Sequence, residues 1–227
     1  MRYVFLRQGL LLLLLLFVPI WGLAHDVSSA DQEILHGGSL WAYIRVGATH
    51  MLTGYDHLLF LAGVVFYLNN FNDILKFITV FTIGHCISLI GATYFGITAN
   101  EHLVDAVIAL SVLYKGFENL GGFEQLKIKS PNLLIMVGLF GLIHGFGLST
   151  RLQSFDLGTE QILAKILCFN LGVEVGQVLA LIPIIFIITL SRKHHQFPAF
   201  YKAVNGYLVL AGIALFVYQL YHYVVGH

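Results

Sequence analysis

Six long apolar stretches dominate the sequence, and each is long enough to cross a lipid bilayer as a helix. They cover residues 44–68, 75–96, 103–121, 132–150, 161–190 and 202–224. A helix rises about 1.5 Å per residue, so about 20 residues cross a hydrocarbon core about 30 Å thick. Only 11% of the residues are charged, against about 25% in a typical soluble domain. The chain is therefore predicted to be an all-α, polytopic transmembrane helix bundle, with residues 44–227 forming one domain of six spans in the lipid bilayer.

The N-terminus has the pattern of a secretory signal peptide. Two arginines precede an unbroken apolar run, and small residues then follow at Gly22 and Ala24, in the positions of a cleavage site. Residues 1–24 are therefore predicted to be removed, which leaves residues 25–43 as a periplasmic N-terminal segment. An uncleaved signal would instead add a seventh span and leave the downstream orientation unchanged.

Positive charges favour one orientation of the six spans. With residue 25 outside, the cytoplasmic ends carry Lys76, Lys115, Lys127, Lys129, Arg192, Lys193 and Lys202, and the outer ends carry Arg45, Arg151 and Lys165. Lys and Arg accumulate on the cytoplasmic side of membrane proteins. The predicted location is thus a bacterial inner membrane, with both termini in the periplasm after cleavage.

Overall charge argues against nucleic-acid binding, and cysteine content argues against a disulfide-stabilised fold. A formal net charge of zero provides no basic surface of the kind that binds nucleic acid. Cys86 and Cys168 both lie within apolar runs, with the spacing of neither a CxxC pair nor a disulfide framework. They are predicted to be buried thiols, with a role as soft metal ligands as the alternative.

Ionisable side chains interrupt the first apolar stretch at His50, Asp56 and His57. An ionisable group at membrane depth costs about 3 kcal/mol on insertion scales and marks an ion path or a site. Imidazole and carboxylate are also ligands of transition metals. On a regular helix His50 and His57 lie about 10.5 Å apart along the axis, so one ion can touch both only if the helix is broken. Thr53 and Gly54 would permit such a break; otherwise the two histidines form successive steps of a ladder.

More polar side chains lie in the other stretches. His85 lies near the middle of the second, His144 stands among glycines in the fourth, and Glu174 shares one helical face of the fifth with Asn170 and Gln177. The predicted metal ligands are His25, His50, Asp56, His57, His85, His144 and Glu174, with Asn170, Gln177 and Glu118 as supporting polar groups. Taken singly, these residues have other interpretations: interhelical hydrogen bonding for the amides, and an interfacial charge beside Lys115 for Glu118.

The pattern His50-x5-Asp56-His57, on the first span after a signal peptide, resembles the HupE/UreJ family of small membrane proteins. Similar blocks are Gly84-His85, Gly141-Leu142-Ile143-His144-Gly145 and the segment 169–177. The resemblance covers essentially the whole mature chain and implicates His50, Asp56 and His57 most directly. It implies a nickel permease associated with hydrogenase or urease, and maturation factors of those metalloenzymes as partners.

The chain differs from hydrogenase-linked members of that family at a second motif. Those members carry Phe-His-Gly-x-Ala/Val-His-Gly-x-Glu, whereas here only His144 stands in the comparable glycine-rich place and Glu174 lies on the next span. The resemblance is therefore to a divergent branch.

We expect from these observations an inner-membrane permease for a divalent transition metal, nickel first and cobalt, zinc or copper as alternatives, rather than an enzyme. The sequence has no nucleotide-binding motif, so transport would be passive, driven by the membrane potential, or coupled to protons through Asp56 or Glu174. Two other functions fit the same residues. One is an intramembrane metal-dependent hydrolase of the zinc type. The other is a metal- or haem-binding accessory protein that does not transport. The sequence gives no signal for an oligomeric state.

Overall fold

The computed structural model describes residues 38–66, 71–153 and 161–226, and within these ranges the regular elements are helices. They are α3 Leu40–Thr53, α4 Tyr55–Val65, α5 Phe71–Phe95, α6 Glu101–Asn119, α7 Gly122–Gln125, α8 Leu133–Gln153, α9 Ile162–Arg192 and α10 Phe197–Val225. The predicted signal peptide and His25 lie outside the described residues. The first described helix begins at Leu40, so the predicted periplasmic segment 25–43 overlaps it by one turn.

Four of these helices are long and apolar enough to cross a membrane, which identifies a multi-pass membrane protein. They are Asn72–Phe95 of α5, Leu133–Gln153 (α8), Ile162–Arg192 (α9) and Phe197–Val225 (α10). The remaining two predicted spans have a different character. Helix α6 carries charged residues within its length, among them Asp105, Lys115 and Glu118. The predicted stretch 44–68 is divided into α3 and α4 at Gly54, where the sequence left a break open, and six crossings stay a prediction.

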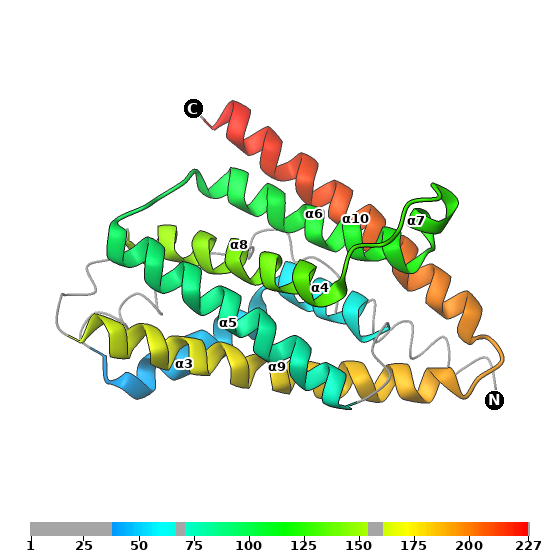
Figure 1. The fold of residues 1–227 in the computed structure, drawn as a ribbon, viewed down its shortest axis with the longest axis horizontal. Helices are drawn as coiled ribbons and strands as arrows, with labels where there is room; N and C mark the ends of the chain where they lie inside the picture. Colours follow the sequence, from blue (N-terminus) through cyan, green and yellow to red (C-terminus); the bar gives the residue numbers. More distant parts are fainter. Residues whose placement is uncertain (1–37, 67–70, 154–160, 227) are drawn as a thin grey trace.

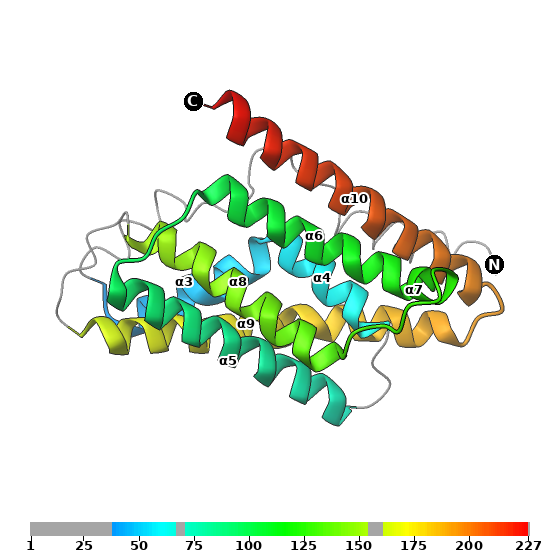
Figure 2. The same cartoon turned by 45° about the horizontal axis from the view of Figure 1, so that its top comes forward.

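The long helices pack in three close pairs with a short helix among them. The pairs are α3 with α9, α5 with α8, and α6 with α10. Helix α4 contacts both α6 and α9, and it lies among the longer helices in both views (Figures 1 and 2). It is apolar on every side, and its residues are buried from Asp56 onward except for Leu58. A helix of this composition belongs in the core of a bundle.

The helices alternate in direction along the chain. Helices α5, α8 and α10 begin, and α6 and α9 end, toward the end of the bundle where α7 lies, on the right in Figure 1. The opposite ends of these helices lie toward the other side. Successive helices therefore alternate in direction, as consecutive membrane crossings must.

Glycines allow two of the helix pairs to approach closely. A Cβ atom on Gly176 of α9 would lie 2.8 Å from the carbonyl oxygen of Ala48 in α3, and one on Gly172 would meet the carbonyl oxygen of Ile44. Gly141 and Gly145 of α8 pack in the same way against the backbone of α5. Small residues at such contacts are typical of membrane helix packing.

The variant Gly172→Ala tests this packing. Its Cβ has no room against the α3 backbone, so we expect the free energy of unfolding to fall by about 1–3 kcal/mol. Thermal unfolding of the detergent-purified protein measures the change. Gly206→Ala is the matched control, because a Cβ at that helical position meets nothing within 4 Å. Equal stability of the two variants would contradict the close approach of α3 and α9.

Candidate metal centre

The site begins with the break between α3 and α4. Gly54 has extended backbone angles, φ −70° and ψ 106°, and separates the two helices. Its N–H donates to the carbonyl of His50 at 3.0 Å, and its own carbonyl accepts from the N–H of Leu58 at 3.1 Å. The break brings His50 and His57 together, with their ring centres 5.2 Å apart. On an unbroken helix the two residues would lie about 10.5 Å apart along the axis, so this contact depends on the break.

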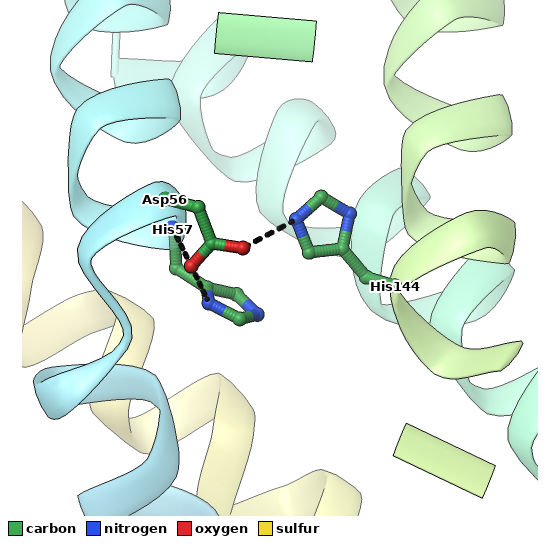
Figure 3. Close-up of side chains that lie close together, drawn as sticks. All are labelled: Asp56, His57 and His144. Atoms are coloured by element: carbon green, nitrogen blue, oxygen red, sulfur yellow. Dashed lines mark hydrogen bonds and ion pairs between the residues drawn. The ribbon is translucent and has the colours of Figure 1, made fainter. Parts of the chain in front are cut away.

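Three ionisable side chains meet just after this break (Figure 3). Asp56 and His57 come from the first turn of α4, and His144 comes from α8 across the bundle. The carboxylate of Asp56 lies between the two imidazole rings, with one oxygen toward each. The three side chains are buried, at 2%, 4% and 3% exposed for Asp56, His57 and His144.

The carboxylate fixes the orientation and tautomer of His57. Oδ1 of Asp56 lies 2.8 Å from Nδ1 of His57 and also accepts the backbone N–H of His57 at 2.8 Å. Because the ionised carboxylate can only accept, Nδ1 carries the proton and Nε2 keeps a lone pair. A carboxylate that orients a histidine in this way is typical of metal centres.

His144 is held in the same tautomer by the backbone of its own helix. Its Nδ1 donates to the carbonyl of Phe140 at 2.7 Å, which leaves Nε2 as the unprotonated nitrogen. Among the described residues, this buried Nε2 has no hydrogen-bond partner. A buried polar atom without a partner costs about 1–3 kcal/mol, and a bound cation would remove that cost.

The spacing of the three groups suits one ion. Nε2 of His144 lies 4.0 Å from Oδ2 of Asp56, which is too far for a hydrogen bond. Two atoms that share one transition metal at about 2.0–2.2 Å each are separated by up to about twice that length. The three residues offer ligand atoms that all lie within 4.8 Å of one another. The cluster of Asp56, His57 and His144 is called the metal cluster below.

Aromatic rings close the space on one side of the metal cluster. The ring of Phe60 lies 5.2 Å from that of Phe140 and 6.4 Å from that of His144, measured between centres. The ring of Phe81 lies edge-on to His144 at 5.2 Å. Phe60 follows His57 by three residues in α4 and Phe140 precedes His144 by four in α8, so both rings lie about one helical turn from the metal cluster.

His85 lies close to the metal cluster but outside it. Its Nδ1 lies 2.8 Å from Oδ1 of Asn170 on α9, and its ring stacks on Phe81 at 6.2 Å. Phe81 thus contacts the rings of both His85 and His144. Asn170 also donates to the carbonyl of Ile166 at 3.0 Å, which identifies its Oδ1 as the acceptor for His85.

The remaining predicted ligands occupy separate positions. His50 is half-buried on the last turn of α3, with its ring 6.0 Å from that of Phe169. Glu174 is half-buried on α9 and, within the described part of the chain, forms no hydrogen bond or ion pair. Gln177 is fully buried and accepts from the hydroxyl of Thr82 at 3.3 Å. The structure therefore brings three of the predicted ligands together and leaves His50, His85 and Glu174 outside that group.

Two buried ion pairs were not predicted from the sequence. Nη2 of Arg151 donates to Oδ2 of Asp105 at 2.6 Å and so joins α8 to α6. Nζ of Lys115 donates to Oε2 of Glu118 at 2.6 Å, with side chains 1% and 5% exposed. From the sequence, Glu118 was predicted to be a supporting polar group, with an interfacial charge beside Lys115 as the alternative, and the buried pairing of the two was not predicted.

The sequence matches a known protein family. The family model described as HupE / UreJ protein matches residues 11–227, essentially the whole chain. The chain belongs to the HupE/UreJ family. No curated protein and no solved structure matches it. Membership of the HupE/UreJ family indicates an accessory role in metal transport by a multi-pass membrane protein, and it is not a family of known enzymes.

The HupE/UreJ match and the metal cluster bear on the same residues. The family resemblance rested first on His50-x5-Asp56-His57, and two of those three residues belong to the metal cluster. The third residue of the metal cluster, His144, comes from the glycine-rich block of α8 that also resembled the family. The residues on which the sequence resemblance was based are thus largely those of the metal cluster.

Proposed function

We propose that the protein is an inner-membrane permease that takes up a divalent transition metal ion, nickel first, from the periplasm. Asp56, His57 and His144 bind the ion as substrate and replace part of its water shell. His50 delivers the ion from the outer side, where His25 captures it, and His85 and Glu174 contribute to the path. The six predicted spans, with both termini in the periplasm, provide the orientation.

The observation that carries this proposal is the helix break at Gly54, beside three converging ligands. Secondary transporters bind their ions at interrupted membrane helices, where the freed helix ends and nearby side chains face the ion. The N-terminus of α4 lies at the break, and the carboxylate of Asp56 in its first turn compensates the positive end of the helix dipole. A purely structural histidine cluster has no need of this interruption.

The chemistry of the ligands selects the substrate class. Two neutral imidazoles with one carboxylate suit nickel, cobalt, zinc and copper, and they bind calcium and magnesium poorly. A doubly charged ion gains about 4.6 kcal/mol per 100 mV when it moves inward across the membrane. The membrane potential is therefore a sufficient driving force, with no nucleotide required.

One observation also favours an intramembrane metalloenzyme. Two histidines and one carboxylate form a three-ligand set, which in zinc hydrolases leaves a fourth position for an activated water. That function requires one tightly held ion per chain and no flux of metal.

Uptake of radioactive nickel distinguishes these functions. The protein is produced in cells that lack their own nickel transporters, and uptake is measured with and without excess cobalt, zinc or copper. We expect accumulation that exceeds that of cells with the empty vector, and competition that ranks the ions. A metal retained on the purified protein, together with no uptake of any of these ions, would reject the permease and favour the enzyme.

Metal binding is expected to weaken as the pH falls. Only neutral imidazole binds a metal ion, so protons compete with the ion for Nε2 of His57 and of His144. A protonated imidazole has no free lone pair for the ion, so we expect apparent affinity to decline as the pH falls. Equilibrium dialysis of the purified protein with nickel between pH 8 and pH 5 measures the decline. Constant affinity over this range would contradict imidazole ligation.

A further inference from the structure

A second buried polar cluster lies at the end of α6 that is predicted to face the cytoplasm. The ion pair of Lys115 and Glu118 forms its centre. A buried ion pair adds little to stability, because the cost of removing two charges from water offsets their attraction. Ionisable residues inside membrane bundles mark functional sites, so this pair needs an explanation beyond stability.

Hydroxyl groups occupy the other side of the Glu118 carboxylate. Its Oε1 accepts from the hydroxyl of Tyr114 at 3.4 Å and also from the hydroxyl of Ser130. Ser130 belongs to the segment between α7 and α8, so this carboxylate joins that segment to α6. Glu118 is thus fully engaged, and an arriving ion can reach it only if Lys115 withdraws.

Asn119 adds an oxygen that has no partner in the described residues. Its side-chain N–H groups donate to the carbonyl of Gly63 and to Oδ1 of Asn205, both at 2.7 Å. Its own Oδ1 is buried and, in the part of the chain that the structure describes, has no hydrogen bond. Asn119 follows Lys115 by one helical turn on the same face of α6. Carboxylate, amide and hydroxyl oxygens together are the ligand set of a hard or weakly held cation.

This cluster and the metal cluster share one face of α4. Gly63 is two turns beyond Asp56, about 10.5 Å along the helix. A Cβ on Gly63 would lie 2.9 Å from Cγ of Lys115, so the lysine stem packs directly on α4. The ring of Phe140 lies between the two clusters, in contact with Phe60 and 5.7 Å from the ring of Tyr114.

We propose that Glu118, Asn119 and Ser130 form a second, oxygen-lined site for the transported divalent cation, which the ammonium group of Lys115 closes until the ion arrives. This inference rests on the proposed function. Oxygen ligands hold late transition metals more weakly than imidazole does, and a path that conducts ions needs a site from which they can leave. Lys115 supplies the positive charge that the buried carboxylate requires while no ion is present.

Cobalt(II) binding to the purified full-length protein tests this assignment. Equilibrium dialysis should give one cobalt ion per wild-type chain, and a second, weaker ion in Lys115→Met. The double variant Lys115→Met, Glu118→Gln should return to one ion, and Lys115→Arg should stay at one. Lys76→Met is the matched control, because Lys76 forms an exposed ion pair with Asp73 at the same i, i+3 spacing. Equal numbers of bound ions in Lys115→Met and in the wild type would overturn the inference.

A second measurement uses the wild-type protein and so does not depend on the folding of a variant. An amine-reactive reagent is applied without cobalt and with cobalt far above the dialysis concentration, so that the ion competes with the ammonium group for the second site. Labelling of Lys115 is read by mass spectrometry. We expect labelling to rise severalfold with cobalt, because the ion displaces the ammonium. Unchanged labelling would overturn the inference.

The two proposals fail in different ways. If the metal cluster does not bind cobalt, the wild type binds no ion while Lys115→Met binds one, and the permease is rejected while the second site stands. If the wild type binds one ion and Lys115→Met gains none, the metal cluster stands and the second site is rejected.

Discussion

Replacing both Asp56 and His57 by alanine should reduce nickel uptake to the level of cells without the protein. The double variant removes two of the three ligands of the metal cluster and leaves His144 alone. Loss of a single group that only orients a ligand costs about 10–100-fold in metal affinity, and loss of two ligands must exceed that. Uptake of radioactive nickel, normalised to the amount of protein in the membrane, measures the effect.

His194→Ala is the control for this experiment, since His194 is exposed in the turn between α9 and α10. That variant should transport as the wild type does. Asp56→Asn separates charge from hydrogen bonding, because the amide oxygen can still accept from Nδ1 of His57. We expect it to lose about 10–100-fold in affinity. Transport by the double variant equal to that of His194→Ala would exclude the metal cluster from the path.

The variant Gly54→Ala should impair metal binding without removing any ligand. A Cβ at this position would meet Nδ1 of His57 and would lie 3.2 Å from the carbonyl oxygen of His50. Alanine also favours helix over glycine by about 1 kcal/mol, so it promotes a continuous helix through residue 54. Either change moves His57 away from Asp56, and we expect nickel affinity to fall at least about tenfold.

Gly91→Ala provides the control for Gly54→Ala. A Cβ at Gly91 in α5 meets nothing within 4 Å, so this variant should bind nickel as the wild type does. Equilibrium dialysis of both purified variants gives the comparison. Equal affinities would show that the break between α3 and α4 does not position the ligands.

The sequence predicted the helical class, and it singled out the three ionisable residues that the structure brings together. Periodicity and length identified the apolar stretches, and ionisable residues within them could be recognised because they are costly there. These features depend on local composition, which a sequence displays directly.

The sequence predicted the division of the first stretch only conditionally. One ion could touch both His50 and His57 only if the helix was broken between them. Residues 44–68 are apolar enough for one span, and nothing in their composition requires a break at Gly54. The break is stabilised by tertiary contacts, since α4 is buried against α6 and α9. The choice among His85, His144 and Glu174 as partners of Asp56 likewise depends on how α5, α8 and α9 pack, which spacing along the chain does not specify.

Helix α4 also constrains the order in which the protein can assemble. At 11 residues it is about 16 Å long, roughly half the thickness of a hydrocarbon core. Lipid alone cannot hold so short a segment in place, and α4 is held by α6 and α9, which the ribosome makes later. The histidine that completes the metal cluster lies in α8, which is also made after α4. During synthesis Asp56 and His57 therefore enter the membrane before their partners exist, and a metal-binding chain emerges only when the C-terminal half has been inserted.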